Sequence, residues 1–330
     1  MNNLSIPWWG WWLMGLGMAA FVAGMVITVR RNRGVRRSFY AWPYTVWMIV
    51  FTIVPLILIG YYALTDASGN FTLNNFASFW DSNREMKQQL ITQGFDPAAL
   101  GMGARGTVNV DTLVYSLWMA FLCTGISFVL GYPAALFMAD RHFKLGPTLV
   151  VLFVIPMWMN FLLRTVAWMS LLEDNGLINS VLQTLGLGRL KLMYNSQAVL
   201  LGMVYNFLPF MVFPIYNALS KQDYRLSEAS MDLGANGWLT FWRVTFPLSL
   251  PGIISGITMV FMPSVTTFFI PRVLGGGNTE MFGDLIERTF LTADNWNVGS
   301  ALSLIMMVLI LISLGLLRKV DPEGEGGSMI

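Results

Sequence analysis

Seven apolar segments divide the chain, and each is long enough for a helix to cross the hydrocarbon core of a membrane. One crossing needs about 20 apolar residues. The segments lie at residues 8–29, 41–64, 112–138, 147–172, 197–219, from 248 onward, and at 298–317. Hydrophobic residues make up 55% of the 330 positions and charged residues only 12%, which is the balance of a membrane protein. The sequence therefore predicts an all-α membrane protein.

The distribution of basic residues sets the expected orientation of these spans. The segment at 8–29 is followed, not preceded, by arginines, so it differs from a signal peptide and is expected to remain as a span. These arginines are Arg30, Arg31, Arg33, Arg36 and Arg37. Because cytoplasmic loops are enriched in Lys and Arg, we expect an outside N-terminus and a cytoplasmic C-terminus. Residues 1–40 then form an extra N-terminal transmembrane helix with a basic linker, and residues 320–330 a cytoplasmic tail.

Three polar stretches are expected on the outer side. Residues 65–110 are rich in acids, Gly and Asn, and they form either a docking surface for a soluble protein or a solvated connector. Residues 175–196 contain Ile178, Leu182 and Leu185 at helical spacing, which predicts a helix along the outer surface. Residues 272–295 combine glycines with acidic residues and are expected to form an outer loop.

Polar side chains and prolines interrupt the fourth and fifth segments. Asn160 and Arg164 lie in the fourth, and polar groups at membrane depth must face protein or a water-filled path. Arg164 is either a pathway residue or one whose charged end reaches the outer interface, with Glu173 and Asp174 as available partners. The fifth segment contains Tyr205 and Asn206 and is expected to be interrupted at two prolines, although a kinked packing helix remains the alternative. These prolines are Pro209 and Pro214.

Residues 220–247 form a polar loop between the fifth and sixth segments. Leu226, Ala229, Ser230 and Leu233 recur at helical spacing, which predicts a short amphipathic helix that Gly234 ends. A second short helix is expected to follow and to stop at Pro247, whose ring removes a backbone donor. The sequence predicts two short helices on a membrane surface, with Glu228 paired to Arg225 or to a residue of another protein.

At this loop the chain resembles the permease subunits of ATP-binding-cassette (ABC) importers. The matching positions, in order, are Glu228, Ala229, Gly234, Ala235, Phe241 or Trp242, Pro247, Pro251, Gly252 and Ile253. Ser230 stands where a second Ala is usual and Phe246 where a Leu is usual. The resemblance implies a six-span permease core over residues 41–319 in a bacterial inner membrane, with cytoplasmic coupling helices. The residues that it implies for coupling to an ATPase are Glu228, Ala229, Ser230, Gly234, Ala235 and Pro247.

The same resemblance implies several partners and no chemistry within this chain. It implies a cytoplasmic ABC ATPase dimer that holds ATP and magnesium, a second homologous permease subunit and an extracytoplasmic substrate-binding protein. The sequence has no G-x-x-x-x-G-K-[ST] phosphate loop, and Cys123 and His142 are its only cysteine and histidine. We therefore expect no catalytic residue, no metal site and no cofactor in this chain, with membrane lipid around it and no nucleic-acid partner.

A closer resemblance covers roughly the last two thirds of the chain and concerns the first type of spermidine/putrescine permease. The motifs that carry it are Gly131-Tyr132-Pro133, Ile155-Pro156-Met157-Trp158, Leu163-Arg164-Thr165, Leu208-Pro209-Phe210-Met211-Val212 and Gly275-Gly276. It implies transport of polyamines, which aromatic rings hold by cation–π contact. The candidate residues of the substrate path are Trp158, Asn160, Tyr205, Asn206 and Tyr216.

Two other functions are compatible with the apolar spans. One is a related ABC importer for another small organic solute. The other is a secondary carrier driven by an ion gradient, which usually has paired repeats and an acidic residue inside the membrane. No clear repeat is visible here, and Asp and Glu avoid the interiors of the spans. A scaffold that recruits soluble proteins would explain the polar loop but not the polar, proline-containing spans.

Overall fold

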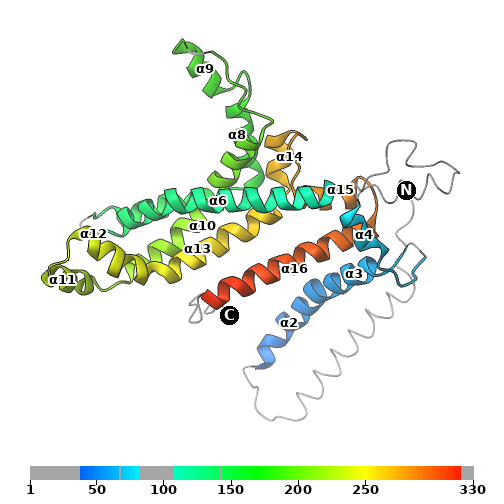
Figure 1. Cartoon of the computed structure of the whole chain (residues 1–330), viewed down its shortest axis with the longest axis horizontal. Coiled ribbons are helices and arrows are strands. Elements are labelled where there is room, and N and C mark those ends of the chain that lie inside the picture. Colours follow the sequence, from blue (N-terminus) through cyan, green and yellow to red (C-terminus); the bar gives the residue numbers. More distant parts are fainter. Residues whose placement is uncertain (1–37, 67, 82–107, 142, 187, 321–330) are drawn as a thin grey trace. The chain divides into compact units, whose positions relative to one another are not determined.

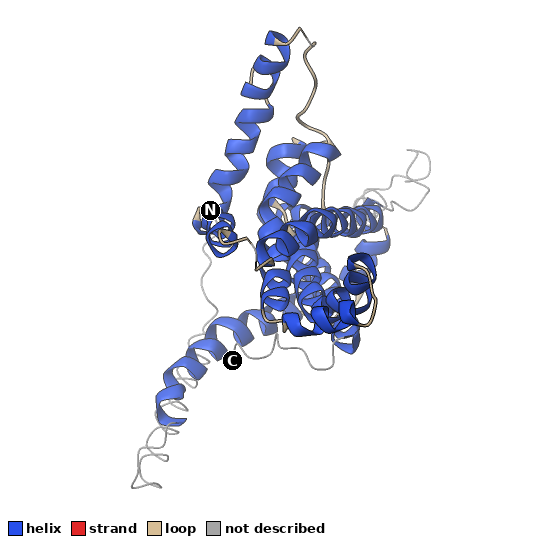
Figure 2. Cartoon of the chain, turned by 90° about the vertical axis from the view of Figure 1, so that its left-hand side faces the viewer, coloured by secondary structure: helices blue, strands red, loops and turns tan. Residues whose placement is uncertain are grey.

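A computed structural model of the chain describes residues 38–66, 68–81, 108–141, 143–186 and 188–320 (Figure 1). The expected first span at 8–29 and its arginines lie outside these ranges, as do most of the expected tail and residues 82–107 of the first outer segment. The chain divides into two compact units, Met1–Tyr62 and Ala63–Ile330. Within the described ranges all regular structure is helical, and an isolated bridge between Thr65 and Phe71 is the only β-pairing (Figure 2).

The first unit contains one long apolar helical run. It consists of α2 (Ser38–Met48), the π-helical segment η1 (Ile49–Ile53) and α3 (Val54–Ala63). The π-helical segment ends two residues before Pro55, which has no backbone N–H to donate. Residues Tyr44–Ala63 are long and apolar enough to cross a membrane, and almost all of their side chains are uncovered within the chain. This run matches the expected second span.

Three long helices form the core of the second unit. They are α6 (Val108–Ala139), α10 (Ser196–Ser220) and α13 (Phe246–Thr266), which lie side by side in Figure 1. Helix α10 is the most enclosed, with Met203, Met211 and Ile215 fully buried. Gly252 and Gly256 let α13 approach α10 closely, because a Cβ at Gly252 would lie 2.7 Å from the carbonyl oxygen of Pro214. These two glycines, four residues apart in the sixth span, therefore serve helix packing.

A second, smaller core lies at the end of the bundle where α6 begins and α13 ends. It contains α4 (Asn74–Trp80), α15 (Phe282–Leu291) and α16 (Trp296–Val320), with the rings of Phe79 and Phe282 6.2 Å apart. The amide nitrogens of Asn75 and Asn297 both donate to the carbonyl oxygen of Thr65, at 2.8 and 2.6 Å. These bonds fix the start of the first outer segment against the last span. The outer segment thus contains some helix, as expected.

The fourth span is not the continuous helix that the sequence predicts over 147–172. Helix α7 (Gly146–Trp158) and α8 (Phe161–Leu172) are separated at Met159, and the direction of the chain changes by 94°. Met159 has an extended backbone, and Asn160 caps α8 by accepting a hydrogen bond from the Leu162 amide at 2.8 Å. Asn160, expected at membrane depth within a continuous span, is therefore the cap at the start of a new helix. The part of the chain that the structure describes thus has five spanning helices, or six with this bent pair as one span.

Two expectations about proline are also wrong. Pro209 and Pro214 do not interrupt the fifth span, since α10 runs unbroken over 25 residues. Its packing between α6 and α13 stabilises the helix despite the two missing backbone donors. Pro247 does not end the second short helix. Helix α12 (Gly237–Thr240), the π-helical segment η2 (Phe241–Thr245) and α13 form one run, in which Pro247 occupies the first turn of α13.

The remaining outer elements are short. Helix α9 (Leu177–Thr184) confirms the helix expected in residues 175–196, and together with α8 it projects from the side of the bundle (Figure 1). Helix α14 (Phe269–Gly275) follows α13 and packs against α8 and α10. The backbone amide of Tyr194 donates to the carbonyl oxygen of Leu274 at 2.9 Å, which ties the segment after α9 to α14.

Candidate functional site

The loop between α10 and α13 folds as a capped helix followed by a sharp turn. Helix α11 (Tyr224–Asp232) begins at Asp223, whose carboxylate accepts from the Arg225 amide at 3.1 Å. It ends at Gly234, which has φ of +90°, a conformation that favours glycine. Asn236 then caps α12 by accepting from the Leu239 amide at 2.8 Å. The expected first helix and its glycine stop are confirmed.

Side-chain hydroxyls join the two helices of this loop. The Ser230 and Thr240 hydroxyl oxygens lie 3.1 Å apart, and Thr240 is buried. The Ala235 amide donates to the Ser230 carbonyl oxygen at 3.1 Å. At the base of the loop, the Gln222 amide nitrogen donates to the Thr245 carbonyl oxygen at 3.2 Å. Helix α11 is thus fixed to the start of the run that continues into the sixth span.

Aromatic rings anchor this run to the bundle. The ring of Tyr132 on α6 lies 5.9 Å from that of Phe241 and 5.7 Å from that of Phe246. Its hydroxyl is 3.1 Å from the hydroxyl of Ser249, which is fully buried on α13. Phe246, which stands where the resemblance leads us to expect Leu, adds an aromatic contact with α6. The loop is therefore rigid at its base.

The opposite side of the loop is an uncovered apolar surface. Leu233 and Trp238 expose 89% and 71% of their area, and Leu226 and Met231 are also exposed. We call this set, Leu226, Met231, Leu233 and Trp238, the coupling surface. An uncovered apolar surface on a braced element is typical of a protein docking site.

The positions predicted for coupling lie in and around this surface. Glu228, Ala229, Gly234 and Pro247 are exposed, while Ser230 and Ala235 are half-buried between the helices. The expected pair between Glu228 and Arg225 is not formed, because in the described residues the Glu228 carboxylate makes no hydrogen bond or ion pair. The carboxylate is therefore free to meet a basic group of another protein.

The predicted path residues fall into three separate places. Trp158, 85% exposed, and Asn160 lie at the break between α7 and α8. Tyr205 lies on α10, where its ring is 5.1 Å from that of Trp168 on α8. Tyr216 lies three turns further along α10, about 16 Å from Tyr205, and it packs against the main core. The structure brings Tyr205 to the broken span but leaves Tyr216 apart from it.

Asn206 is the most enclosed of these residues, at 1% exposure. Its amide nitrogen donates to the Gly202 carbonyl oxygen at 2.8 Å, and its amide oxygen has no partner in the described residues. An unpaired buried acceptor is costly, so this oxygen would be stabilised by any donor that reaches it.

Arg164 lies on α8, one helical turn before Trp168, whose ring is 5.1 Å from that of Tyr205. Only 7% of its area is exposed. The pairing that the sequence offers with Glu173 or Asp174 is not formed, since both are exposed and neither makes an ion pair in the described residues. The sequence reasoning missed Trp168, for which the spacing of four residues from Arg164 was the available signal.

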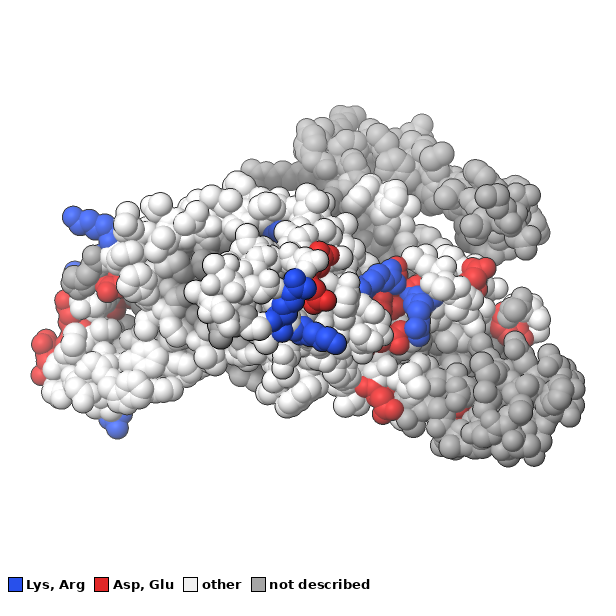
Figure 3. Space-filling view, turned by 90° about the horizontal axis from the view of Figure 1, so that it is seen from above, with Lys and Arg blue, Asp and Glu red and all other residues white. Residues whose placement is uncertain are grey.

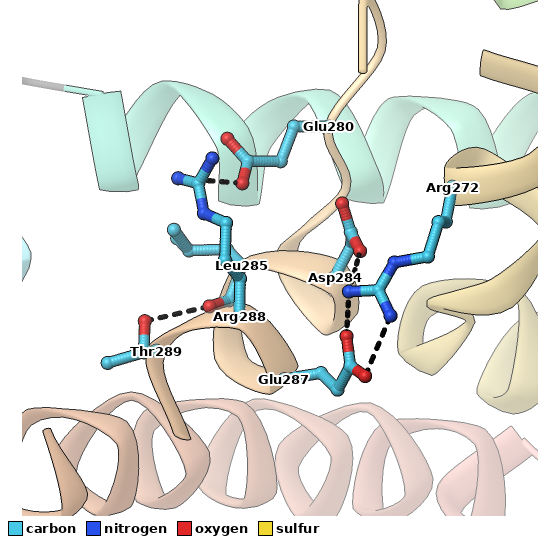
Figure 4. Close-up of polar contacts among 7 residues, drawn as sticks. All are labelled: Arg272, Glu280, Asp284, Leu285, Glu287, Arg288 and Thr289. Carbon is cyan, nitrogen blue, oxygen red and sulfur yellow. Dashed lines mark hydrogen bonds and ion pairs between the residues drawn. The ribbon is translucent and has the colours of Figure 1, made fainter. Parts of the chain in front are cut away.

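A cluster of charges joins α14, α15 and the segment between them (Figure 4). Arg272 pairs with Asp284 at 3.1 Å and forms a two-pronged pair with Glu287, and Arg288 pairs with Glu280 at 2.9 Å. Burial raises the pKa of Glu280 and of Asp284, and the nearby arginines oppose this effect. These pairs hold the expected outer loop as a defined helical element.

On the face seen in Figure 3, the charged side chains gather in separate groups with uncharged surface between them. No group of three or more His, Cys, Asp or Glu side chains in the described residues is arranged to hold a metal ion. Cys123, the single cysteine, is buried in α6.

Comparison with known proteins gives a consistent result at three levels. The family model described as binding-protein-dependent transport system inner membrane component matches residues 131–323. The spermidine/putrescine transport system permease protein PotB of Haemophilus influenzae is 34% identical over 266 residues, 80% of this chain and 86% of the relative. PotB of Escherichia coli K12 is 33% identical over 272 residues, 80% of this chain and 90% of the relative.

Solved structures show a similar fold. The chain matches a bacterial ABC transporter involved in the import of the acidic polysaccharide alginate, with a TM-score of 0.66, over 84% of this chain and 93% of that one. A second structure, of a bacterial alginate ABC transporter in complex with a pentasaccharide-bound periplasmic protein, matches with a TM-score of 0.59, over 86% and 93% of the two chains. Both are 15% identical to this chain, so they bear on the fold alone.

Proposed function

The chain belongs to the binding-protein-dependent transport system inner membrane components, the permease subunits of ABC importers, and we propose that it carries polyamines such as spermidine and putrescine inward. The observation that carries the substrate class is the 34% identity to a spermidine/putrescine permease over 80% of the chain. Membership of this family argues against the alternative of a secondary carrier driven by an ion gradient. A related importer of another small organic solute remains the second candidate.

The coupling surface supports a contact with a separate ATPase. The chain has no phosphate loop of its own, so ATP and magnesium are bound and ATP is hydrolysed by a cytoplasmic ATPase dimer. That dimer contacts Leu233, Trp238 and the free Glu228 carboxylate. In this arrangement the loop and the C-terminus are cytoplasmic and the N-terminus is outside.

The continuity of α12, η2 and α13 suggests how movement reaches the membrane. A displacement of α11 passes through the Ser230–Thr240 contact to α12, and no flexible connection separates α12 from the sixth span. The packing of Gly252 and Gly256 on α10 then transmits it to the fifth span. The spans thereby alternate between outward-open and inward-open states.

Substrate passage needs further subunits. A second permease subunit supplies the other half of the path, and an extracytoplasmic binding protein delivers the polyamine. The rings of Trp158, Trp168 and Tyr205 line the broken fourth span, where they offer cation–π contacts to protonated amines. The unpaired oxygen of Asn206 offers a hydrogen-bond acceptor to the same groups.

Transport by the assembled complex tests this function. The chain, its second permease, the ATPase and the binding protein are reconstituted in vesicles with ATP inside, and uptake of labelled spermidine is measured. We expect uptake that requires ATP and is unaffected when ion gradients are collapsed. ATP-dependent uptake of another organic solute, without competition from excess spermidine or putrescine, would support the second candidate instead.

A further inference from the structure

Arg164 is a buried cation without an anion. Only 7% of its side chain is exposed, and its Nε atom is fully enclosed without a partner. Its two Nη groups make no hydrogen bond or ion pair with any described residue either, but unlike Nε they are not fully enclosed. A guanidinium carries five donors and stays charged, so leaving it unpaired in an apolar setting is strongly unfavourable. The isolated chain is therefore incomplete at this position.

The elements around Arg164 hold no carboxylate. Helix α8 packs against α9, α10 and α14, and none of these four helices contains Asp or Glu. The first acid after Arg164 in the chain is Glu173, about 13 Å further along the direction of α8, and it is exposed. A polyamine does not fill the gap either, since its amines are positively charged and a bare guanidinium beside the path repels them.

The surface next to Arg164 is apolar and uncovered. Trp158, Leu163 and Val166 on the broken span are exposed, and so are Leu201 and Tyr205 on α10. We call this set, Trp158, Leu163, Val166, Leu201 and Tyr205, the Arg164 face. We propose that the second permease subunit covers the Arg164 face and inserts a carboxylate that pairs with the Arg164 guanidinium.

This inference rests on the proposed function, which requires a second permease subunit. Charge complementarity is the argument that the second permease subunit supplies a carboxylate. A planar carboxylate matches the two Nη groups of a guanidinium in a two-pronged pair. Access to the guanidinium is limited, since Nε is fully enclosed and only the Nη groups remain reachable. A single side chain fits such access better than a branched phospholipid headgroup. Pairing also removes the repulsion that the bare guanidinium would exert on an incoming polyamine.

A charge exchange tests the pair. The variant Arg164→Glu is expressed with a tagged second permease, and the amount of this chain that co-purifies is measured. Because loss of one partner of a buried charge pair weakens an interface strongly, we expect a fall of about tenfold or more. Lys191→Glu reverses an exposed charge in the segment after α9 and is expected to co-purify as the wild type does.

The acids of the second permease are then changed one at a time to Lys or Arg in the Arg164→Glu background. Restoration of co-purification by one such change, which by itself disrupts pairing with wild-type Arg164, is the expected result. Wild-type pairing by Arg164→Glu, or the absence of any restoring position, would overturn the proposal.

Reconstitution with and without anionic lipid distinguishes a lipid phosphate from a protein carboxylate as the partner of Arg164. If wild-type transport requires anionic lipid and Arg164→Gln removes that requirement, the anion is lipid and the proposal fails. Co-purification does not depend on the substrate. A wild-type complex that assembles and hydrolyses ATP but does not import polyamines would therefore contradict the proposed substrate while leaving the charge pair testable.

Discussion

The hydroxyl of Ser230 on α11 lies 3.1 Å from the hydroxyl of buried Thr240 on α12, and this contact connects the coupling surface to the sixth span. Ser230 occupies the position where the family usually has Ala. A second Ala would leave the Thr240 hydroxyl without this partner. The departure from the motif therefore adds a link between α11 and the helical run that continues into the sixth span.

Removing the Ser230 hydroxyl is expected to loosen this link. A hydrogen bond of this kind contributes about 1 kcal/mol, so we expect Ser230→Ala to lower uptake per ATP hydrolysed by about fivefold while ATP hydrolysis continues. The control is Ser227→Ala on the same helix, because the Ser227 hydroxyl makes no hydrogen bond in the described residues. Equal coupling ratios for the two variants, measured in vesicles, would show that the contact transmits nothing.

Gly234 is expected to be the least replaceable residue of the loop. Its φ of +90° is unfavourable for a side chain by about 1–2 kcal/mol, so Gly234→Ala should shift α11 and lower co-purification with the ATPase. Gly237→Ala is the matched control, since Gly237 has no unusual φ and an added Cβ would meet open space. If the Gly237 variant loses the ATPase as much as the Gly234 variant, the turn geometry is not the cause.

Gly234→Asp and Glu228→Arg are expected to leave the protein in the membrane and abolish uptake.

Hydropathy and local sequence signals predict much of the fold. Runs of apolar residues locate α6, α10 and α16, because a spanning segment must be long and uncharged wherever it packs. Gly234 is found for a similar reason, since a helix end with positive φ depends on the local backbone alone. Asn160 could have been recognised as a helix cap, but inside an apolar run its amide was interpreted as a buried polar group.

The other differences depend on contacts between distant segments. Pro209 and Pro214 lie in a continuous helix because α6 and α13 enclose α10, and a single segment does not reveal its neighbours. The grouping of Arg164, Trp168 and Tyr205 likewise requires the 94° change of direction at Met159. Local sequence thus predicts that these residues are unusual, and only the tertiary packing shows which of them meet.

Acidification is expected to affect the outer charge cluster in an unusual direction. Burial raises the pKa of the Glu280 and Asp284 carboxylates in the folded protein. The folded state therefore binds protons more readily than the unfolded one, and its stability rises as pH falls from above the raised values towards the ordinary value near 4. We expect Glu280→Gln to weaken this dependence, measured as the change in thermal unfolding temperature in detergent between pH 7.5 and 5. If the Glu280→Gln protein shows the same pH dependence of its unfolding temperature as the wild type, Glu280 is not the group responsible.

Close packing at Gly252 predicts a loss of stability for larger side chains. A Cβ there would lie 2.5 Å from the Ala218 Cβ and 2.7 Å from the Pro214 carbonyl oxygen, and helix backbone on α10 cannot move aside cheaply. We expect Gly252→Val to destabilise the bundle by about 1–3 kcal/mol, measured by thermal unfolding in detergent. Gly315→Val on α16 is the control, because an added Cβ at Gly315 would meet open space. If the proposed movement passes from α13 to α10 through this contact, the Gly252 variant should also lose uptake at temperatures where it remains folded. Normal uptake by a folded Gly252→Val protein would place the transmission between the sixth and fifth spans elsewhere.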